Sequence, residues 1–176
     1  NEAKAIPELL IKLKPFSNQG HEIIIVDDGS TDESSEIISN CNFVESIHCK
    51  TNRGKGAALK KGLKKIINDK VIIFDGDLEI NPIEISKLMV LDQNKRIYFA
   101  MGYRLKDGNP VGYPFKWGNF IFTTFFNILF LSNSKDILCC AKSFYLNNID
   151  KFKLVSDRFD IDAELAPLKY ELNSHK

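Results

Sequence analysis

The chain has 176 residues, of which 44% are hydrophobic and 27% charged, an ordinary balance for a globular protein. This length is enough for one compact domain with a substantial core, so we expect residues 1–176 to form a single domain. The formal net charge of +1 argues against a surface that coats nucleic acid, and we expect no partner of that class.

Helical and strand patterns alternate along the chain. In order, the predicted elements are a helix over 6–13, a strand over 22–26, a helix over 30–40, a weaker strand over 43–49, a helix over 57–67, a strand over 71–74, a helix over 82–88, a strand over 97–101 and a helix over 117–131. This alternation predicts a Rossmann-like α/β fold, in which a mostly parallel sheet has helices on both faces. In such sheets, ligands bind at the carboxyl ends of the strands.

Two carboxylates, Asp75 and Asp77, follow the strand predicted over 71–74. They would repel each other at the end of a buried strand, and a bound cation would resolve that conflict. Mg²⁺ and Mn²⁺ prefer oxygen ligands and often take only one or two from the protein, with phosphates and water completing the shell. A D-x-D turn alone is a weak signal, and an ordinary solvated turn is the alternative.

A second acidic cluster, D-D-G-S-T-D over 27–32, follows the strand predicted over 22–26. Its carboxylates, Asp28 among them, can accept hydrogen bonds from a nucleotide base or a ribose hydroxyl. The alternative is a helix N-cap in which Ser30 or Asp32 satisfies the free amides, and the two roles can coexist.

A glycine-rich turn, N-R-G-K-G over 52–56, is the third candidate feature. Gly54 and Gly56 permit a tight backbone turn, and Lys55 can face a phosphate or a base edge. The turn matches neither G-x-x-x-x-G-K-[ST] nor G-x-G-x-x-G, which argues against a P-loop NTPase and a classical dinucleotide-binding dehydrogenase. The lysines that follow are more typical of a solvated helix face.

These motifs resemble, in order and spacing, those of family 2 glycosyltransferases of the GT-A fold, at 1–2, 27–32, 52–57 and 75–77. The chain is most similar to the branch of dolichol-phosphate mannose synthases and polyprenyl-phosphate glycosyltransferases. Residues 102–104 resemble the G-S-R of that branch, 118–119 its G-N helix start, 136–144 its D-x-x-[ST]-G-[FY]-[KR]-x-F and 159–165 its F-[DE]-x-[DE]-x-E-[LI]. The family's first strand and the membrane segments that often follow the domain are missing, so we expect a fragment of a larger enzyme.

The resemblance implies a role for each matching residue. It places Asp28 at the nucleotide base with Gly54 and Lys55 beside it, Asp75 near the ribose and diphosphate, and a metal on Asp75 and Asp77. The remaining substrate-binding residues that it implies are Glu2, Ser30 and Lys142.

The expected catalytic residues are Arg104, Asp136 and Glu164. The resemblance implies that Arg104 faces the phosphates and that Glu164 lies on the acceptor side. Asp136 is our candidate for a base or an acceptor-orienting carboxylate, with a helix N-cap as the alternative.

The implied activity is that of a metal-dependent, inverting glycosyltransferase with Mg²⁺ or Mn²⁺ as cofactor. It would move a hexose from a UDP- or GDP-linked sugar to an acceptor, for which a polyprenyl phosphate is one candidate. Two alternatives stay open: a catalytically silent nucleotide-binding domain of the same fold, and a sugar nucleotidyltransferase, although the glycine-rich activation loop of the latter is not seen.

The apolar stretch 120–131 is too short to span a bilayer and is rich in aromatic residues for a surface helix. Core packing is one interpretation, and peripheral membrane contact through 117–131 is the other, motivated by Lys116 and Trp117 at its entrance. The four cysteines lack C-x-x-C spacing, and no signal peptide is present. These features predict free thiols and a cytoplasmic location, with the inner face of the membrane as a more specific hypothesis.

Overall fold

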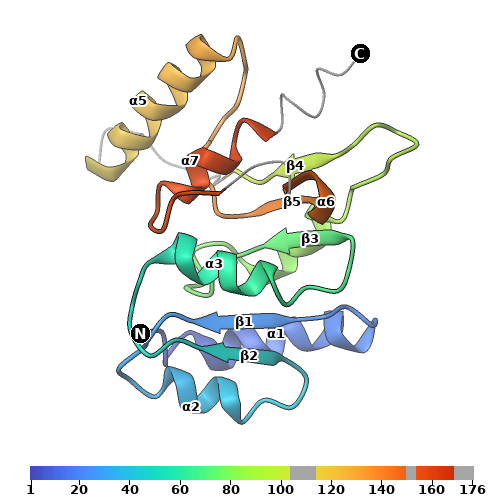
Figure 1. Ribbon diagram of the computed structural model, residues 1–176, viewed down its shortest axis with the longest axis vertical. Coiled ribbons are helices and arrows are strands. Elements are labelled where there is room, and N and C mark those ends of the chain that lie inside the picture. Colours follow the sequence, from blue (N-terminus) through green and yellow to red (C-terminus); the bar gives the residue numbers. More distant parts are fainter. Residues whose placement is uncertain (104–113, 150–153, 169–176) are drawn as a thin grey trace.

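The computed structural model describes residues 1–103, 114–149 and 154–168, with the backbone alone over 114–117 (Figure 1). Its elements in chain order are α1 (Ile6–Asn18), β1 (Ile24–Asp27), α2 (Ser34–Ser39), β2 (Glu45–His48), α3 (Lys55–Leu63), β3 (Lys70–Ile73), the 3-10 helix η1 (Pro82–Glu84), α4 (Ile85–Leu88), β4 (Phe99–Met101), α5 (Pro114–Leu129), β5 (Lys142–Tyr145), α6 (Leu146–Ile149) and α7 (Ile161–Leu165).

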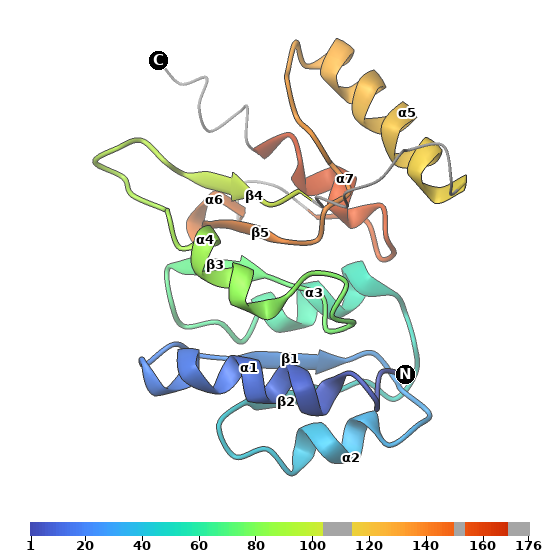
Figure 2. The same ribbon diagram turned by 180° about the vertical axis from the view of Figure 1, so that it is seen from behind.

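The strands lie one above another, in the order β4, β5, β3, β1, β2 from top to bottom in Figures 1 and 2. Strands β1 and β2 pair in parallel, with Ile24 opposite Glu45 and Asp27 opposite His48. Strand β5 pairs antiparallel with both β3 and β4 and lies between them. The expected α/β class is confirmed, and among the described strands the parallel pairing is limited to β1 and β2, because β5 enters in the opposite direction.

Helices cover both faces of these strands, as expected. Helix α3 lies in front of the strands in Figure 1, where a Cβ added to Gly62 would lie 3.2 Å from the Val26 side chain of β1. Helices α1 and α4 lie in front in Figure 2, and Leu9 and Leu13 of α1 form one apolar cluster with Ile85 of α4. The site described below lies at the ends of strands held between these layers.

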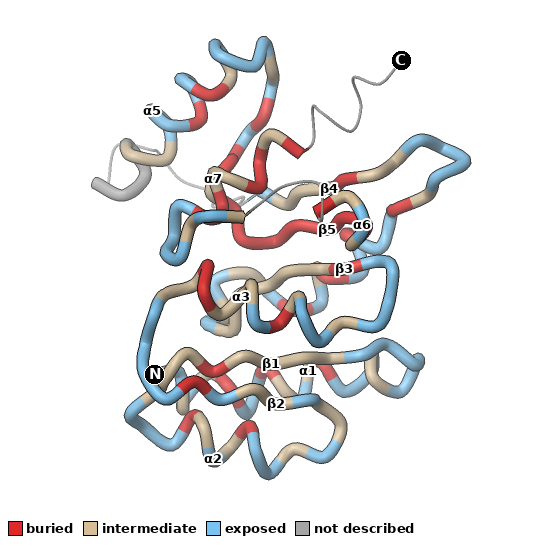
Figure 3. Tube along the Cα trace, viewed as in Figure 1, coloured by how far each residue is buried: buried red, intermediate tan, exposed pale blue. Residues whose placement is uncertain are grey.

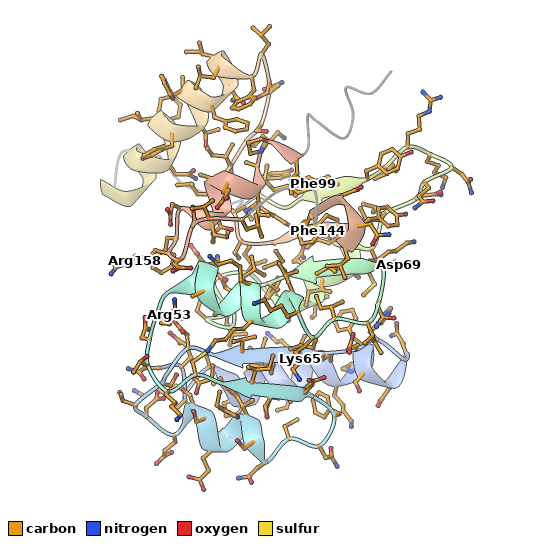
Figure 4. All side chains as sticks on the ribbon, in the orientation of Figure 1. Arg53, Lys65, Asp69, Phe99, Phe144 and Arg158 are labelled. Carbon is orange, nitrogen blue, oxygen red and sulfur yellow. The ribbon has the colours of Figure 1, made fainter. Side chains whose placement is uncertain are left out.

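The main core lies around β5 and the last described helix. Its buried members are Val71, Phe99, Phe144, Ile149, Ile161, Leu165 and Leu168. Figure 3 shows β5 buried along its length, and the rings of Phe99 and Phe144 stack with centroids 6.5 Å apart (Figure 4). Burial of one such large apolar side chain stabilises a fold by about 1.5–3 kcal/mol, so the C-terminal elements contribute much of the core.

Two differences from the predicted elements have local causes. Helix α2 begins at Ser34 instead of residue 30, because the Asp27 carboxylate accepts a hydrogen bond from the Ser30 amide and Asp32 accepts one from the Ser34 amide. The expected helix over 82–88 is divided into η1 and α4, with the Asn81 side chain accepting a hydrogen bond from the Ile83 amide.

Candidate active site

The acidic cluster after β1 and the glycine-rich turn before α3 pack directly against each other. Oδ2 of Asp28 accepts hydrogen bonds from the backbone amides of Arg53, at 3.0 Å, and Gly54, at 2.6 Å. Gly29 allows this approach, since it has a φ of 78° and an added Cβ would lie 2.7 Å from the Asn52 amide nitrogen. Asp28 and Gly54 are therefore in direct contact, and their shared role at the nucleotide base stays a prediction.

The second carboxylate oxygen of Asp28 differs from the first. Among the described residues, Asp28 Oδ1 is one of two buried side-chain polar atoms with no hydrogen-bond partner, the other being Nδ2 of Asn148. A buried carboxylate oxygen without a donor is costly, so such an atom calls for an explanation, and a bound ligand is one. Asp28 Oδ1 has almost no exposed surface, so a ligand that displaces the groups covering it can donate a hydrogen bond to it without disturbing the bonds that Oδ2 makes.

Lys55, the first residue of α3, joins this turn to the end of β3. Its Nζ donates to Oδ2 of Asp75, at 2.8 Å, and to Oδ2 of Asp162, at 2.7 Å. Burial alone would lower the pKa of Lys55, but the charges of Asp75 and Asp162 and their hydrogen bonds raise it. Lys55 therefore stays a cation at neutral pH, beside one of the expected metal-binding carboxylates.

Asp162 extends the cluster into the interior. Its Oδ1 accepts a hydrogen bond from Lys142 Nζ at 2.8 Å, and Lys142 also donates to the Cys139 carbonyl. Sequence reasoning placed Asp162 in a motif but gave it no role, since no local pattern connects it to Lys55, 107 residues earlier. Lys142, expected to bind substrate, is fully buried and has no surface for direct contact in this arrangement.

The two candidate metal ligands have different surroundings. Asp75 forms an ion pair with Lys55, so the lysine neutralises the negative charge that we expected a metal ion to balance. Asp77 is exposed, and its Oδ1 accepts a hydrogen bond from the Glu79 amide at 2.9 Å. No group of three or more His, Cys, Asp or Glu side chains suited to a metal occurs within 1–103, 118–149 and 154–168. Two carboxylates fit a Mg²⁺ or Mn²⁺ ion only where phosphate oxygens and water supply the other ligands.

The N-terminal residues lie against the acidic cluster, near the position that the motifs imply. The Glu2 amide donates to Ser34 Oγ at 2.9 Å, while the Glu2 side chain is exposed. Ser30 Oγ accepts a hydrogen bond from the N-terminal ammonium of Asn1 at 3.2 Å. Asn1 Oδ1 accepts another from the Thr31 amide at 2.7 Å, so residues 1 and 2 brace the loop that carries Ser30.

Asp136 lies three residues before Cys139, whose carbonyl accepts the hydrogen bond from Lys142, and beside a hollow of about 180 Å³ lined by 101–103 and 133–136. Its side chain is buried, and Oδ1 accepts a hydrogen bond from Asn119 of α5 at 2.8 Å. A turn over 137–138 follows it instead of a helix, so the alternative of a helix N-cap is wrong. Lys135 lies over the Tyr103 ring at 4.6 Å and adds a positive charge to the hollow, whereas Arg104 lies outside the described residues.

Glu164 braces a loop. Its two carboxylate oxygens accept hydrogen bonds from the amides of Val155, at 2.8 Å, and Ser156, at 2.9 Å. Burial would raise the pKa of Glu164, but these hydrogen bonds outweigh it and lower the pKa. The braced loop covers the glycine-rich turn, because the Asp157 carbonyl accepts a hydrogen bond from the Ala57 amide at 3.0 Å. A catalytic role for Glu164 stays a prediction.

The apolar helix α5 does not pack into the core along its length. Phe126 and Thr123 are buried, whereas Phe122, Phe125 and Ile128 are mostly exposed. Core packing of the whole stretch is therefore wrong. No helix within the described part of the chain is long and apolar enough to cross a membrane. The four cysteines are free thiols, as expected.

A comparison with solved structures identifies the fold class of this protein. Two structures of glucosyl-3-phosphoglycerate synthase from Mycobacterium tuberculosis, in complex with phosphoglyceric acid and with UDP, match the chain with TM-scores of 0.71 and 0.70. Each match covers 92% of this chain and 59% of the other, at 19% and 18% identity respectively, and at that identity the likeness concerns the fold alone. The expected GT-A fold is confirmed.

The family follows from the sequence comparison: residues 1–152 match glycosyl transferase family 2, and the chain belongs to that family. Undecaprenyl-phosphate 4-deoxy-4-formamido-L-arabinose transferases of Pseudomonas savastanoi pv. phaseolicola and Proteus mirabilis are 38% and 34% identical over 100 and 97 residues. These matches cover 52% and 51% of this chain but only 29% and 30% of those relatives. An uncharacterized protein of Methanocaldococcus jannaschii is 32% identical over 180 residues, covering 96% of this chain and 71% of that protein. The resemblance to polyprenyl-phosphate glycosyltransferases is confirmed.

Proposed function

We propose that this chain carries the nucleotide-sugar site of a glycosyltransferase that transfers a sugar to a polyprenyl phosphate. The observation that carries the proposal is the buried, unpartnered Oδ1 of Asp28. The other oxygen of Asp28 accepts a hydrogen bond from the amide of Gly54, the residue before Lys55, which forms the ion pair with Asp75. A hydrogen-bond acceptor and a cation at adjacent strand ends match the two parts of a nucleoside diphosphate, a polar base or ribose and an anionic diphosphate. The matched transferases are named for undecaprenyl phosphate, which supports the acceptor class.

In this proposal, Asp28 accepts a hydrogen bond from the base or ribose, and Lys55 lies beside the diphosphate. Asp75 and Asp77 would hold Mg²⁺ or Mn²⁺ together with phosphate oxygens, and the bound metal would offset negative charge on the departing nucleoside diphosphate. Arg104 belongs to the same proposal through its motif, on the phosphate side. Positive groups aimed at the leaving group stabilise the transition state more than the ground state, because negative charge grows there during transfer.

The acceptor phosphate would attack the anomeric carbon from the face opposite the leaving group, which inverts its configuration. A phosphate is already ionised at neutral pH, so little proton removal is needed, and Asp136 would orient the acceptor more than deprotonate it. The hollow beside Asp136 and Lys135 is our candidate for that end of the site. The hexose expected as donor sugar stays a prediction, since the matched transferases are named for a formamido-arabinose.

We place the acceptor's lipid chain near α5, which stands at one corner of the molecule in Figures 1 and 2. Exposed aromatic and aliphatic side chains on one helix are costly in water and favourable at a bilayer surface. Peripheral contact of α5 with the membrane would bring a polyprenyl phosphate to the protein. This contact does not require α5 to cross the membrane, for which it is not long and apolar enough.

The direct test is a transfer assay with UDP- and GDP-linked hexoses, undecaprenyl phosphate in detergent and Mn²⁺. We expect a glycolipid product together with equimolar nucleoside diphosphate. Nucleotide binding without either product would favour the silent domain. Formation of pyrophosphate from a nucleoside triphosphate and a sugar 1-phosphate would favour the nucleotidyltransferase instead.

A further inference from the structure

Four charged side chains form a continuous chain of hydrogen bonds from the interior to the candidate site. In order they are Lys142, Asp162, Lys55 and Asp75, with nitrogen to oxygen distances of 2.8, 2.7 and 2.8 Å. Two positive and two negative charges alternate, so the chain is neutral as a unit. A buried ion pair is tolerated only with such geometry, because an unpaired buried charge is strongly unfavourable.

Exposure rises steadily along this chain. The side chains of Lys142, Asp162, Lys55 and Asp75 are 0%, 7%, 14% and 33% exposed. The interior pair is thus shielded from solvent and held by core elements β5 and α7, while Asp75 reaches the surface of the site. Through these hydrogen bonds, the buried position of Lys142 constrains the positions of Lys55 and Asp75 at the exposed end.

Both oxygens of Asp162 already accept hydrogen bonds from lysines, and its side chain is only 7% exposed, which leaves little surface for a substrate. Its Oδ1 accepts the hydrogen bond from Lys142 and its Oδ2 accepts the one from Lys55. Its position therefore makes it a support for Lys55 instead of a contact to a ligand.

We propose that Asp162, anchored by the buried Lys142, is a positioning residue that fixes the Lys55 ammonium beside Asp75 on the diphosphate side of the site. The proposal rests on the function proposed above, in which Lys55 and Asp75 face a nucleoside diphosphate. Without the Asp162 anion, Lys55 keeps one partner instead of two and its long side chain regains rotamer freedom. A cation held in place before binding loses less entropy when a phosphate arrives.

The test compares wild type with a charge-balanced double variant, Asp162→Asn with Lys142→Met. Removing both interior charges avoids a buried unpaired lysine, and methionine has a similar volume, so the fold is expected to persist. Asp160→Asn is the matched control, since Asp160 precedes the same helix and is exposed. Circular dichroism and melting temperature establish that each variant is folded.

Two readouts then report on Lys55. Acetylation by acetic anhydride, read by peptide mass spectrometry, should modify Lys55 several-fold faster in the double variant and at the wild-type rate in Asp160→Asn. Calorimetric titration with UDP and GDP in Mn²⁺ should show affinity up to about tenfold weaker in the double variant, the entropic cost of immobilising one long side chain on binding. Binding of uridine or guanosine should be unchanged, which a general disturbance of the fold would not achieve.

The outcomes separate the two proposals. Unchanged acetylation of Lys55 and unchanged diphosphate affinity in a folded double variant would overturn the positioning role while leaving nucleotide binding intact. Should wild type bind neither UDP nor GDP, the proposed function fails, and faster acetylation would still show that Asp162 holds Lys55. If the double variant does not fold, Asp162→Glu becomes the test: a longer carboxylate should displace Lys55 and weaken diphosphate binding, and wild-type affinity would contradict the proposal.

Discussion

At the scale of single residues, the neighbouring aspartates Asp27 and Asp28 of the acidic cluster after β1 differ in their hydrogen bonds. Asp27 is buried and accepts hydrogen bonds from Ser30 and Ser35, with His48 Nδ1 3.4 Å away. Asp28, next in sequence, keeps one oxygen unpartnered. Asp27 therefore stabilises the loop with both oxygens, whereas Asp28 stabilises the glycine-rich turn with Oδ2 alone and leaves Oδ1 without a described partner.

Asp27 makes a pH-dependent contribution to stability. Burial would raise the pKa of Asp27, but hydrogen bonds from Ser30, Ser35 and His48 outweigh burial and lower the pKa from 3.8 to about 2. Because the folded-state pKa lies below the unfolded value, the stabilisation is complete above pH 4 and is lost as the pH falls toward 2. The difference corresponds to about 2 kcal/mol of unfolding free energy at neutral pH.

The prediction is that Asp27→Asn lowers the free energy of unfolding by about 2 kcal/mol at pH 7, with a gap that narrows below pH 4. Urea unfolding followed by circular dichroism between pH 7 and pH 3 measures it. A gap of constant size across this range would mean that the Asp27 charge contributes nothing and that the substitution acts through packing alone.

The site residues differ in how well the sequence alone identifies them. Asp28, Lys55 and Asp75 follow strand ends or a glycine turn, so local pattern and topology together predict that they meet. Asp162 could not be assigned in this way, because its partner Lys55 is distant in sequence and a carboxylate on a short helix resembles any solvated one. Its role depends on burial, which only the folded chain reveals.

At the scale of elements, the sequence predicted none of the three described segments after α5, namely β5, α6 and α7, and β5 shows why. All four of its residues are buried, yet Lys142 and Ser143 are polar, so neither alternation nor an apolar run marks a strand. The polar groups are satisfied by Asp162 and by the Leu88 carbonyl, both remote in sequence. Because its polar side chains make hydrogen bonds to residues distant in sequence, the hydrophobic pattern of the sequence does not predict this strand.

Helix α5 carries a prediction of its own. Phe125 and Ile128 are 61% and 68% exposed, and replacing both with asparagine should leave the fold intact. Burial of each in a bilayer surface is worth about 1.5–3 kcal/mol, so the double variant should bind vesicles at least about a hundredfold more weakly. Flotation with vesicles of phosphatidylglycerol and undecaprenyl phosphate measures the bound fraction.

The matched control for α5 is Ile11→Asn, since Ile11 on α1 is 74% exposed and apolar but lies on another helix. This variant should bind vesicles as wild type does. Wild-type protein that stays unbound, or an equal loss of binding with Ile11→Asn, would contradict the membrane role of α5.

At the scale of the whole molecule, the sequence predicted the α/β class but not which strands pair with which, and the position of the site stays a prediction. The alternation of helices and strands determined the layers, because each apolar face must be covered. The sequence pattern could not predict the strand order, because β5 pairs with β3 and β4, which lie dozens of residues earlier in the chain. The same long-range closure brings α7 and its carboxylates to the site.

The central claim is that a nucleoside diphosphate binds between Asp28 and the Asp75–Asp77 pair. The most direct measurement is the melting temperature of the protein with UDP-, GDP- and dTDP-sugars, with and without Mn²⁺, since a ligand that binds only the folded state raises it. Wild type, Asp28→Asn and Asp77→Ala are compared with Asp69→Asn, a control on the opposite side of the molecule from Arg53 in Figure 4.

We predict a rise for wild type with one of the nucleotides that depends on Mn²⁺. The rise should be lost in Asp77→Ala, reduced in Asp28→Asn because an amide donor replaces the free oxygen, and unchanged in Asp69→Asn. No rise with any nucleotide in wild type, or an equal rise in all four proteins, would contradict the proposed site.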